Sequence, residues 1–66
     1  MFATITAEVG KEYKRETSEY LCTEIGDGGC RLRNKTTGFS FIAHDLKEDE
    51  NGNINWSKMT QGRYEK

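Results

Sequence analysis

Apolar and polar residues alternate along much of this chain, and a period of two is typical of β-strands that bury one face. The clearest example is residues 2–9 (FATITAEV), in which every second residue from Ala3 to Val9 would lie on the same face. Residues 10–19 are polar, with Tyr13 as an apolar anchor, so we expect a long loop with at most one helical turn. The pattern therefore predicts that the chain opens with a strand followed by a long loop.

Three further strands are predicted in the centre of the chain, at residues 20–25 (YLCTEI), 30–34 (CRLRN) and 39–46 (FSFIAHDL). The segments between them, GDGG at 26–29 and NKTTG at 34–38, contain the glycines that tight turns favour. Connections this short join neighbouring antiparallel strands. The sequence thus predicts two consecutive hairpins.

The first of these hairpins determines where the two cysteines lie. With Asp27-Gly28 at the tip of a two-residue loop, Ile25 would face Cys30 and Cys22 would face Arg33. Cys22 and Cys30 would then lie on opposite sides of the sheet, where they cannot form a disulfide. A loop one residue longer would place them on the same face but several residues apart along the strands, again beyond disulfide reach. We therefore expect two reduced thiols.

Residues 47–58 (KEDENGNINWSK) can be compared with a twelve-residue calcium-binding loop, because their glycine falls at the position of its sharp turn. The first and last positions of such a loop need acidic ligands, and here they are Lys47 and Lys58. The sequence instead predicts a type I′ hairpin turn at Asn51-Gly52, with the acidic residues 48–50 exposed to solvent beside it.

After this turn, residues 54–56 (INW) are expected to form a short fifth strand. The remaining segment has two readings, either a short helical turn between Ser57 and Gly62 or a last strand around Arg63 and Tyr64. The predicted fold is all-β, a small antiparallel barrel or curled sheet of four to five strands that would be SH3-like or OB-like.

The composition limits which partners are plausible. A chain of 66 residues is expected to be one domain with a thin core, which makes a homo-oligomer plausible. Its 10 Lys and Arg residues and 11 Asp and Glu residues give a net charge of −1, which argues against general binding to duplex DNA. The sequence has neither a signal-peptide pattern nor an apolar run of membrane-spanning length, so we expect a cytoplasmic protein without membrane association.

Residues 37–43 (TGFSFIA) are the most suggestive string for a specific function. Residues 38–42 resemble the aromatic strand of RNA-recognition motifs and cold-shock domains, whose rings stack on bases while basic side chains contact phosphates. The resemblance implies a single-stranded nucleic-acid binder. Its residues would be Phe39, Phe41, Arg31, Arg33 and Lys35. The second aromatic motif of those families is absent, no basic residue precedes Gly38, and two alternating rings also suit the core of a small domain.

The sequence contains no pattern typical of a catalytic or metal site. His44 is the only histidine, and Ser40 lies four residues away, roughly 13 Å along a strand, which is too far for a hydrogen-bonded relay. Cys22, Cys30 and His44 lack the paired spacing of a zinc site. We therefore expect a protein that is not an enzyme and that uses no metal or cofactor.

Taken together, these observations predict a small binding module that acts by protein–protein interaction. Mixed charges of both signs suit a protein partner, and a regulatory or accessory protein of a phage or mobile element would have this size and character. The candidate partner-binding residues are aromatic, outward-facing basic, or part of the acidic turn. They are Tyr13, Tyr20, Arg31, Arg33, Lys35, Glu48, Asp49, Glu50, Trp56 and Tyr64.

Overall fold

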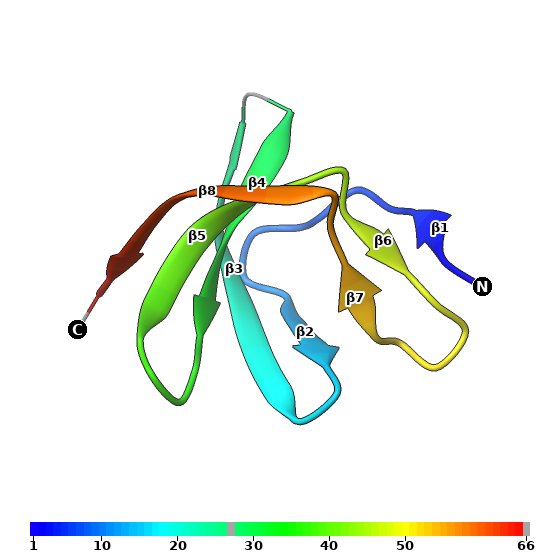
Figure 1. Ribbon diagram of the computed structural model, residues 1–66, viewed down its shortest axis with the longest axis horizontal. Helices are drawn as coiled ribbons and strands as arrows, with labels where there is room; N and C mark the ends of the chain where they lie inside the picture. Colours follow the sequence, from blue (N-terminus) through cyan, green and yellow to red (C-terminus); the bar gives the residue numbers. More distant parts are fainter. Residues whose placement is uncertain (27, 66) are drawn as a thin grey trace.

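The computed structural model describes residues 1–26 and 28–65, and over these residues the chain consists of β-strands joined by turns (Figure 1). The strands are β1 (Ala3–Thr4), β2 (Glu12–Arg15), β3 (Ser18–Gly26), β4 (Gly29–Asn34), β5 (Phe39–His44), β6 (Lys47–Glu48), β7 (Ile54–Asn55) and β8 (Lys58–Tyr64). No part of the described chain forms an apolar helix of the length that a bilayer requires.

Two antiparallel sheets share these strands. Five strands form one sheet in the order β2-β3-β4-β5-β8, and three short strands form the other in the order β1-β6-β7. β5 leads into β6 through a bend at Asp45, whose φ is 59°, and β7 leads into β8 through Ser57. The Ser57 N–H donates to the His44 carbonyl oxygen at 2.9 Å, so both pairs of strands continue as one long bent hairpin.

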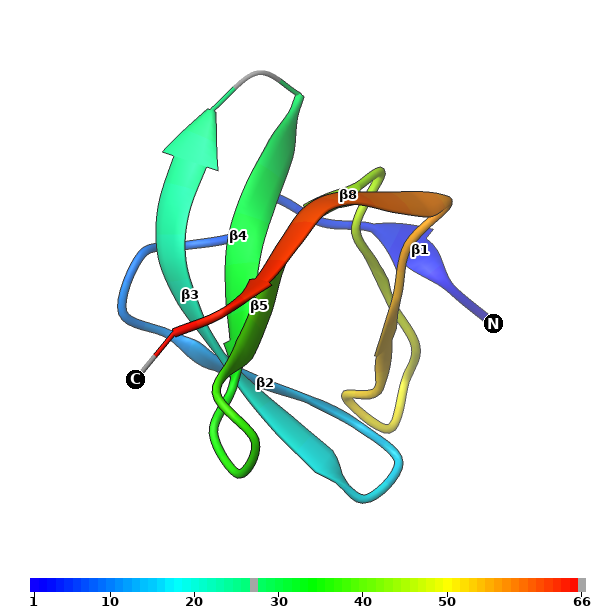
Figure 2. The same cartoon turned by 60° about the vertical axis from the view of Figure 1, so that its left-hand side comes forward.

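The long hairpin returns toward the start of the five-stranded sheet without closing it (Figure 2). A single isolated bridge joins Lys14 of β2 to Asn53, just before β7, and the Glu16 N–H donates to Asn53 Oδ1 at 3.3 Å. The all-β antiparallel prediction is confirmed, whereas the described strands do not form a closed barrel. Of the two readings of the segment after Ser57, the last strand around Arg63 and Tyr64 is confirmed and the helical turn is wrong, because Lys58–Tyr64 pairs with β5.

The core lies between the inner face of the five-stranded sheet and the short strands. Its centre is a set of perpendicular or tilted aromatic rings, with centroid distances of 5.7 Å for Tyr20–Phe41, 6.0 Å for Tyr20–Trp56 and 4.9 Å for Phe41–Trp56. Leu32 and Ile54 are fully buried beside them. Edge-to-face ring contacts add to the burial of apolar area, which suits a chain with so few large hydrophobic residues.

The N-terminal third differs from its prediction. Only Ala3–Thr4 of residues 2–9 is a strand, because β6, its sole pairing partner, is two residues long. The polar segment 10–19 was expected to be a loop, yet β2 pairs with β3 and Tyr13 lies opposite Tyr20. Tyr13 is buried, and its hydroxyl accepts the N–H of Glu8 at 3.0 Å, so this one apolar anchor fixes the whole segment.

A register shift between Cys22 and Glu24 alters the first predicted hairpin. Ile25 pairs with Cys30 as predicted, but Cys22 pairs with Leu32 rather than with Arg33. The β-bulge at Thr23 therefore turns Cys22 to the same face as Cys30, and the predicted placement on opposite sides is wrong. Both cysteines are free and buried. The predicted tip residue Asp27 lies outside the described residues.

The hairpin predicted at Asn51-Gly52 is present between β6 and β7, with a different turn. The Gly52 N–H donates to the Asp49 carbonyl oxygen at 3.1 Å, and Gly52 has a φ of 82° while Asn51 does not have a positive φ. This is a type I turn followed by a left-handed glycine, so the type I′ assignment is wrong. The Asp49 carboxylate accepts the N–H groups of Asn51 and Asn53, both at 2.9 Å.

Candidate binding cleft at the β3–β4 hairpin

The far end of the β3–β4 hairpin projects from the rest of the molecule (Figures 1 and 2). β2 pairs with β3 only as far as Leu21, so the remainder of β3 has β4 as its one neighbouring strand. Ile25, at this end, is 51% exposed, and Val9, in the preceding loop, is 62% exposed. Large apolar side chains are thus left at the surface on both sides of the projecting hairpin.

A cleft of about 470 Å³ lies on the outer face of the sheet at this hairpin, and we call it the outer cleft. Its lining includes Val9, Thr23, Glu24, Ile25, Arg31 and Ile42. A second cleft of about 310 Å³ lies on the inner face and includes Ile5, Ala7, Ile25, Cys30, Ala43 and Leu46. The outer cleft combines polar and apolar groups, whereas the inner cleft is lined mainly by apolar side chains.

Two buried polar atoms in the outer cleft lack a hydrogen-bond partner. Among the described residues, Thr23 Oγ1 and Arg31 Nε are the buried side-chain nitrogen or oxygen atoms without such a partner, and both residues line this cleft. Arg31 Nε lies 3.8 Å from Glu24 Oε1, an ion-pair distance too long for a hydrogen bond. Buried polar groups are nearly always paired, so these two unpaired atoms distinguish the outer cleft within the described part of the chain.

The burial of Arg31 results from β8. Arg31 points to the outer face as predicted, but it is 5% exposed rather than free in solvent, because β8 passes over it and bonds to its guanidinium group through Gln61. One guanidinium nitrogen, Nη1, donates to Ser40 Oγ at 2.9 Å and to the carbonyl oxygen of Gln61 at 3.3 Å. Gln61 belongs to a bulge in β8 and has a φ of 52°, a conformation that directs its carbonyl oxygen toward Arg31. The prediction of an exposed Arg31 is therefore wrong.

The predicted aromatic candidates lie mainly in the core. Tyr13 and Tyr20 are buried, and Trp56 is half-buried with the Arg15 guanidinium 5.0 Å above its ring. Tyr64 is 71% exposed, and its ring packs on that of Phe39 with 5.0 Å between the two ring centroids. Among these four predicted site residues, Tyr64 alone presents most of its ring to solvent.

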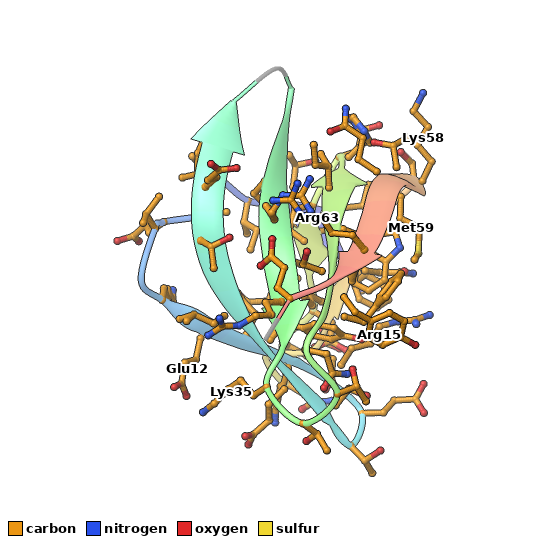
Figure 3. The ribbon with its side chains drawn as sticks, turned by 90° about the vertical axis from the view of Figure 1, so that its left-hand side faces the viewer. Glu12, Arg15, Lys35, Lys58, Met59 and Arg63 are labelled. Atoms are coloured by element: carbon orange, nitrogen blue, oxygen red, sulfur yellow. The ribbon has the colours of Figure 1, made fainter. Side chains whose placement is uncertain are left out.

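The predicted charged candidates are spread over several surfaces. Lys35 bonds to Glu12 at 2.8 Å, and this hydrogen bond raises the pKa of the Lys35 ammonium group (Figure 3). Arg33 is half-buried on β4, and Glu48 is half-buried in β6. Glu50 accepts hydrogen bonds from the Met1 amino group at 2.8 and 2.9 Å.

The remaining predicted residue, Asp49, bonds to its own turn. The N–H of Asn53, then that of Asn51, lowers the pKa of the Asp49 carboxyl group. Its oxygens therefore hold the hairpin together rather than facing a partner. Of the ten predicted site residues, only Arg31 lines the outer cleft.

The other residues of the outer cleft were missed because their exposure depends on tertiary structure. Val9 was assigned to the shared face of the first predicted strand, and Ile25 was placed opposite Cys30 in a regular hairpin. The bulge at Thr23 disrupts that regular pairing. No residue type in YLCTEI signals a bulge, so the sequence offered no usable indication of this cleft.

The histidine, serine and cysteine side chains described here bond to neighbouring groups or are buried. His44 Nε2 lies 2.9 Å from Thr60 Oγ1, and the Ser57 hydroxyl donates to Asp45 at 2.7 Å. Burial raises the pKa of Cys30 to about 11 and also raises that of Cys22, so both thiols are protonated at neutral pH and are poor nucleophiles. Within residues 1–26 and 28–65, no three His, Cys, Asp or Glu side chains come together as a metal site would require.

Comparison with protein-family models, with curated proteins and with solved structures finds no match for this chain.

Proposed function

We propose that this protein is a small non-catalytic binding module that holds an extended segment of a partner protein in the outer cleft. The observation that carries the proposal is the presence of two unpaired buried polar atoms, Thr23 Oγ1 and Arg31 Nε, in a cleft bordered by exposed apolar side chains. A partner that supplies the missing hydrogen bonds removes a penalty of about 1–3 kcal/mol for each group.

The chemistry of the cleft favours a peptide carbonyl as the group that binds. Arg31 Nε is a donor, so it needs an acceptor, while the Thr23 hydroxyl can donate or accept. Glu24 lies beside Arg31, and its side chain is 75% exposed, so it opposes the entry of a second carboxylate. A neutral carbonyl oxygen meets the need of Arg31 without this repulsion.

The apolar border defines the rest of the partner segment. Val9 and Ile25 are each more than half exposed and line the outer cleft with the half-buried Ile42. A segment with one or two large apolar side chains next to the bound carbonyl would cover them. Burying these side chains supplies affinity at roughly 25 cal/mol per Å² of apolar surface removed from water.

Selection from a library of displayed peptides would test this function. Wild-type protein is expected to enrich peptides with apolar side chains, and Ile25→Glu, which places a charge on the cleft border, is expected to lose them. Thr17→Glu is a matched control, because Thr17 is exposed in the β2–β3 turn, away from the cleft. Failure of wild-type protein to enrich any family of peptides, or equal binding by Ile25→Glu, would contradict the proposal.

Single-stranded nucleic acid is the competing partner class, and the burial of Phe41 and Arg31, two of its five proposed residues, favours a protein instead. Phe41 is 2% exposed, so its ring is not available to stack on a base, and Arg31 Nη1 already bonds to Ser40 and Gln61 rather than facing a phosphate. A titration with oligonucleotides at low salt, in which the fluorescence of Trp56 is recorded, tests this alternative. We expect no change at micromolar oligonucleotide, and a saturable change would support the nucleic-acid partner over the protein partner.

A further inference from the structure

β8 is an edge strand that pairs on one side only. Within the described sheet it is bonded to β5 and has no strand beyond it. Six of its seven residues are exposed and Thr60 is half-buried. The backbone of Glu65, next along the chain, donates to the Gly38 carbonyl oxygen at 2.7 Å, so the neighbouring Tyr64 turns its own N–H and C=O to the free edge. Such an edge is a template on which another strand can pair.

The two faces of β8 differ in character. Met59 lies opposite Ala43 and Tyr64 lies opposite Phe39, so both project to the inner face, where they are 48% and 71% exposed. Lys58 lies opposite His44 and projects to the outer face. Glu65, two residues beyond Arg63, also lies on the outer face. Because of the bulge between Thr60 and Arg63, both of these residues project to the outer face, opposite Ile42 and Ser40 of β5.

We propose that β8 pairs antiparallel with β8 of a second copy of this chain, with Lys58 opposite Glu65 and Met59 opposite Tyr64. In this register the two side chains of each directly opposed pair outside the bulge project to the same face of the extended sheet, as antiparallel pairing requires. Two ion pairs form on the outer face and two apolar pairs form on the inner face. The complementary charges make a second copy, rather than an unrelated strand, the occupant of this edge.

Neighbouring registers are less favourable. A shift of one residue sets Lys58 against Tyr64, whose side chains project to opposite faces. A shift of two residues in the same direction sets Lys58 against Arg63, and like charges directly opposite each other are destabilising. Lys58 and the bulge would oppose pairing with an arbitrary strand, whereas in the proposed register Lys58 meets a carboxylate and the two bulges lie next to each other at the two-fold axis.

Within a single chain, the carboxylate of Glu65 is already positioned on the outer face for an ion pair with Lys58 of a second copy. Its carboxylate lies 2.8 Å from Arg63 Nη2, and this contact lowers the pKa of Glu65, so the group is charged at neutral pH. Figure 3 shows Lys58, Met59 and Arg63 along the exposed strand. In the pair of chains, Glu65 would lie between Arg63 of its own chain and Lys58 of the other.

Charge exchange tests both the association and its register. Sedimentation velocity over a concentration series would compare wild type, Lys58→Glu, Glu65→Lys and the double variant. We expect wild type to dimerise, each single variant to raise the dissociation constant by about tenfold or more, and the double variant to restore dimerisation. Met59→Glu provides an independent disruption on the inner face, and circular dichroism verifies that each variant is folded.

Lys11→Glu makes the same charge change away from β8 and is expected to dimerise as wild type does. A wild-type chain that stays monomeric, single variants that dimerise unchanged, or a double variant that stays monomeric would each overturn the proposal. The result is independent of the outer cleft, since Ile25→Glu is expected to leave dimerisation intact.

Discussion

The two halves of β3 have similar sequences and different surroundings. In the first half, Tyr20 and Cys22 are buried beneath the aromatic core, with β2 on one side and β4 on the other. In the second half, Glu24 and Ile25 are exposed, and β4 is the only paired neighbour. The point of change is the bulge at Thr23, which also leaves a hydroxyl without a partner. Burial along this strand is thus decided by what covers it rather than by its own residues.

This contrast separates two tasks within one small domain. We expect the first half of β3 to contribute most to stability, because it lies between β2 and β4 and its Tyr20 and Cys22 side chains belong to the buried core. The projecting half contributes little to that core and offers apolar surface and unpaired donors. If this division is right, substitutions in the first half should affect folding, and those in the second half should affect binding.

The largest effect is expected from isoleucines in the two regions. Ile54→Ala should lower the free energy of unfolding by about 3 kcal/mol, because Ile54 is 1% exposed and its loss leaves a cavity. Ile25→Ala, the same change at a residue that is 51% exposed, should lower it by about 1 kcal/mol or less. Urea unfolding of both variants measures the difference. Equal losses would contradict the division.

The sequence was sufficient for the strands and turns that depend on local chemistry. GDGG, NKTTG and the Asn-Gly turn each connect antiparallel strands as predicted, because glycine and asparagine allow backbone conformations that other residues avoid. β2 was missed, since EYKR has one apolar side chain and its pairing with β3 is formed by the backbone. The strand predicted at residues 2–9 was too long, because alternation shows which side chains would share a face of a strand but not whether another strand is available to pair with it.

The candidate site was the least predictable part. Arg31 and Arg33 are equivalent in the pattern CRLRN, yet Arg31 is buried because a strand about thirty residues later crosses over it. The bulge at Thr23 cannot be read from residue types. Both features arise from contacts between distant segments, which period-two patterns do not encode.

These two arginines provide the second prediction. Arg31→Ala should lower the free energy of unfolding by about 2 kcal/mol, because it removes hydrogen bonds to Ser40 and Gln61 and the packing of a buried side chain. Arg33→Ala should cost about 0.5 kcal/mol or less, since Arg33 is half-buried and makes no such bonds among the described residues. Thermal unfolding compares them, and equal costs would mean that β8 does not hold Arg31 in solution.

The buried thiol of Cys30 predicts how the stability of the protein changes at alkaline pH. Its pKa is raised from 9.0 to about 11 by burial, so the unfolded chain loses this proton first as the pH rises. Stability should therefore fall between pH 9 and pH 11, in addition to the effects of other groups. The Cys30→Ala variant should show a shallower fall over the same range. Parallel pH profiles for the two chains would contradict the burial of this thiol.

The smallest effect is expected at the β6–β7 turn. The Asp49 carboxyl has a pKa below its ordinary value of 3.8 because the N–H groups of Asn53 and Asn51 stabilise its charged form. Its contribution to stability is present above that ordinary value and is lost as the pH falls through the lowered pKa. Asp49→Asn should flatten the acid limb of the stability profile, and Glu16→Gln, a change at an exposed residue in another turn, should not. An unchanged acid limb in Asp49→Asn would contradict the turn geometry.

The most direct test of the account is the NMR signal of the Arg31 side-chain Nε–H, recorded while a library-selected peptide is added. If the outer cleft binds a partner carbonyl, this signal should shift downfield, with further changes at Val9, Thr23, Ile25 and Ile42 and little change at Phe41 or Ile54. A peptide that binds without moving the Arg31 signal, or that perturbs residues away from the outer cleft instead, would contradict the central claim.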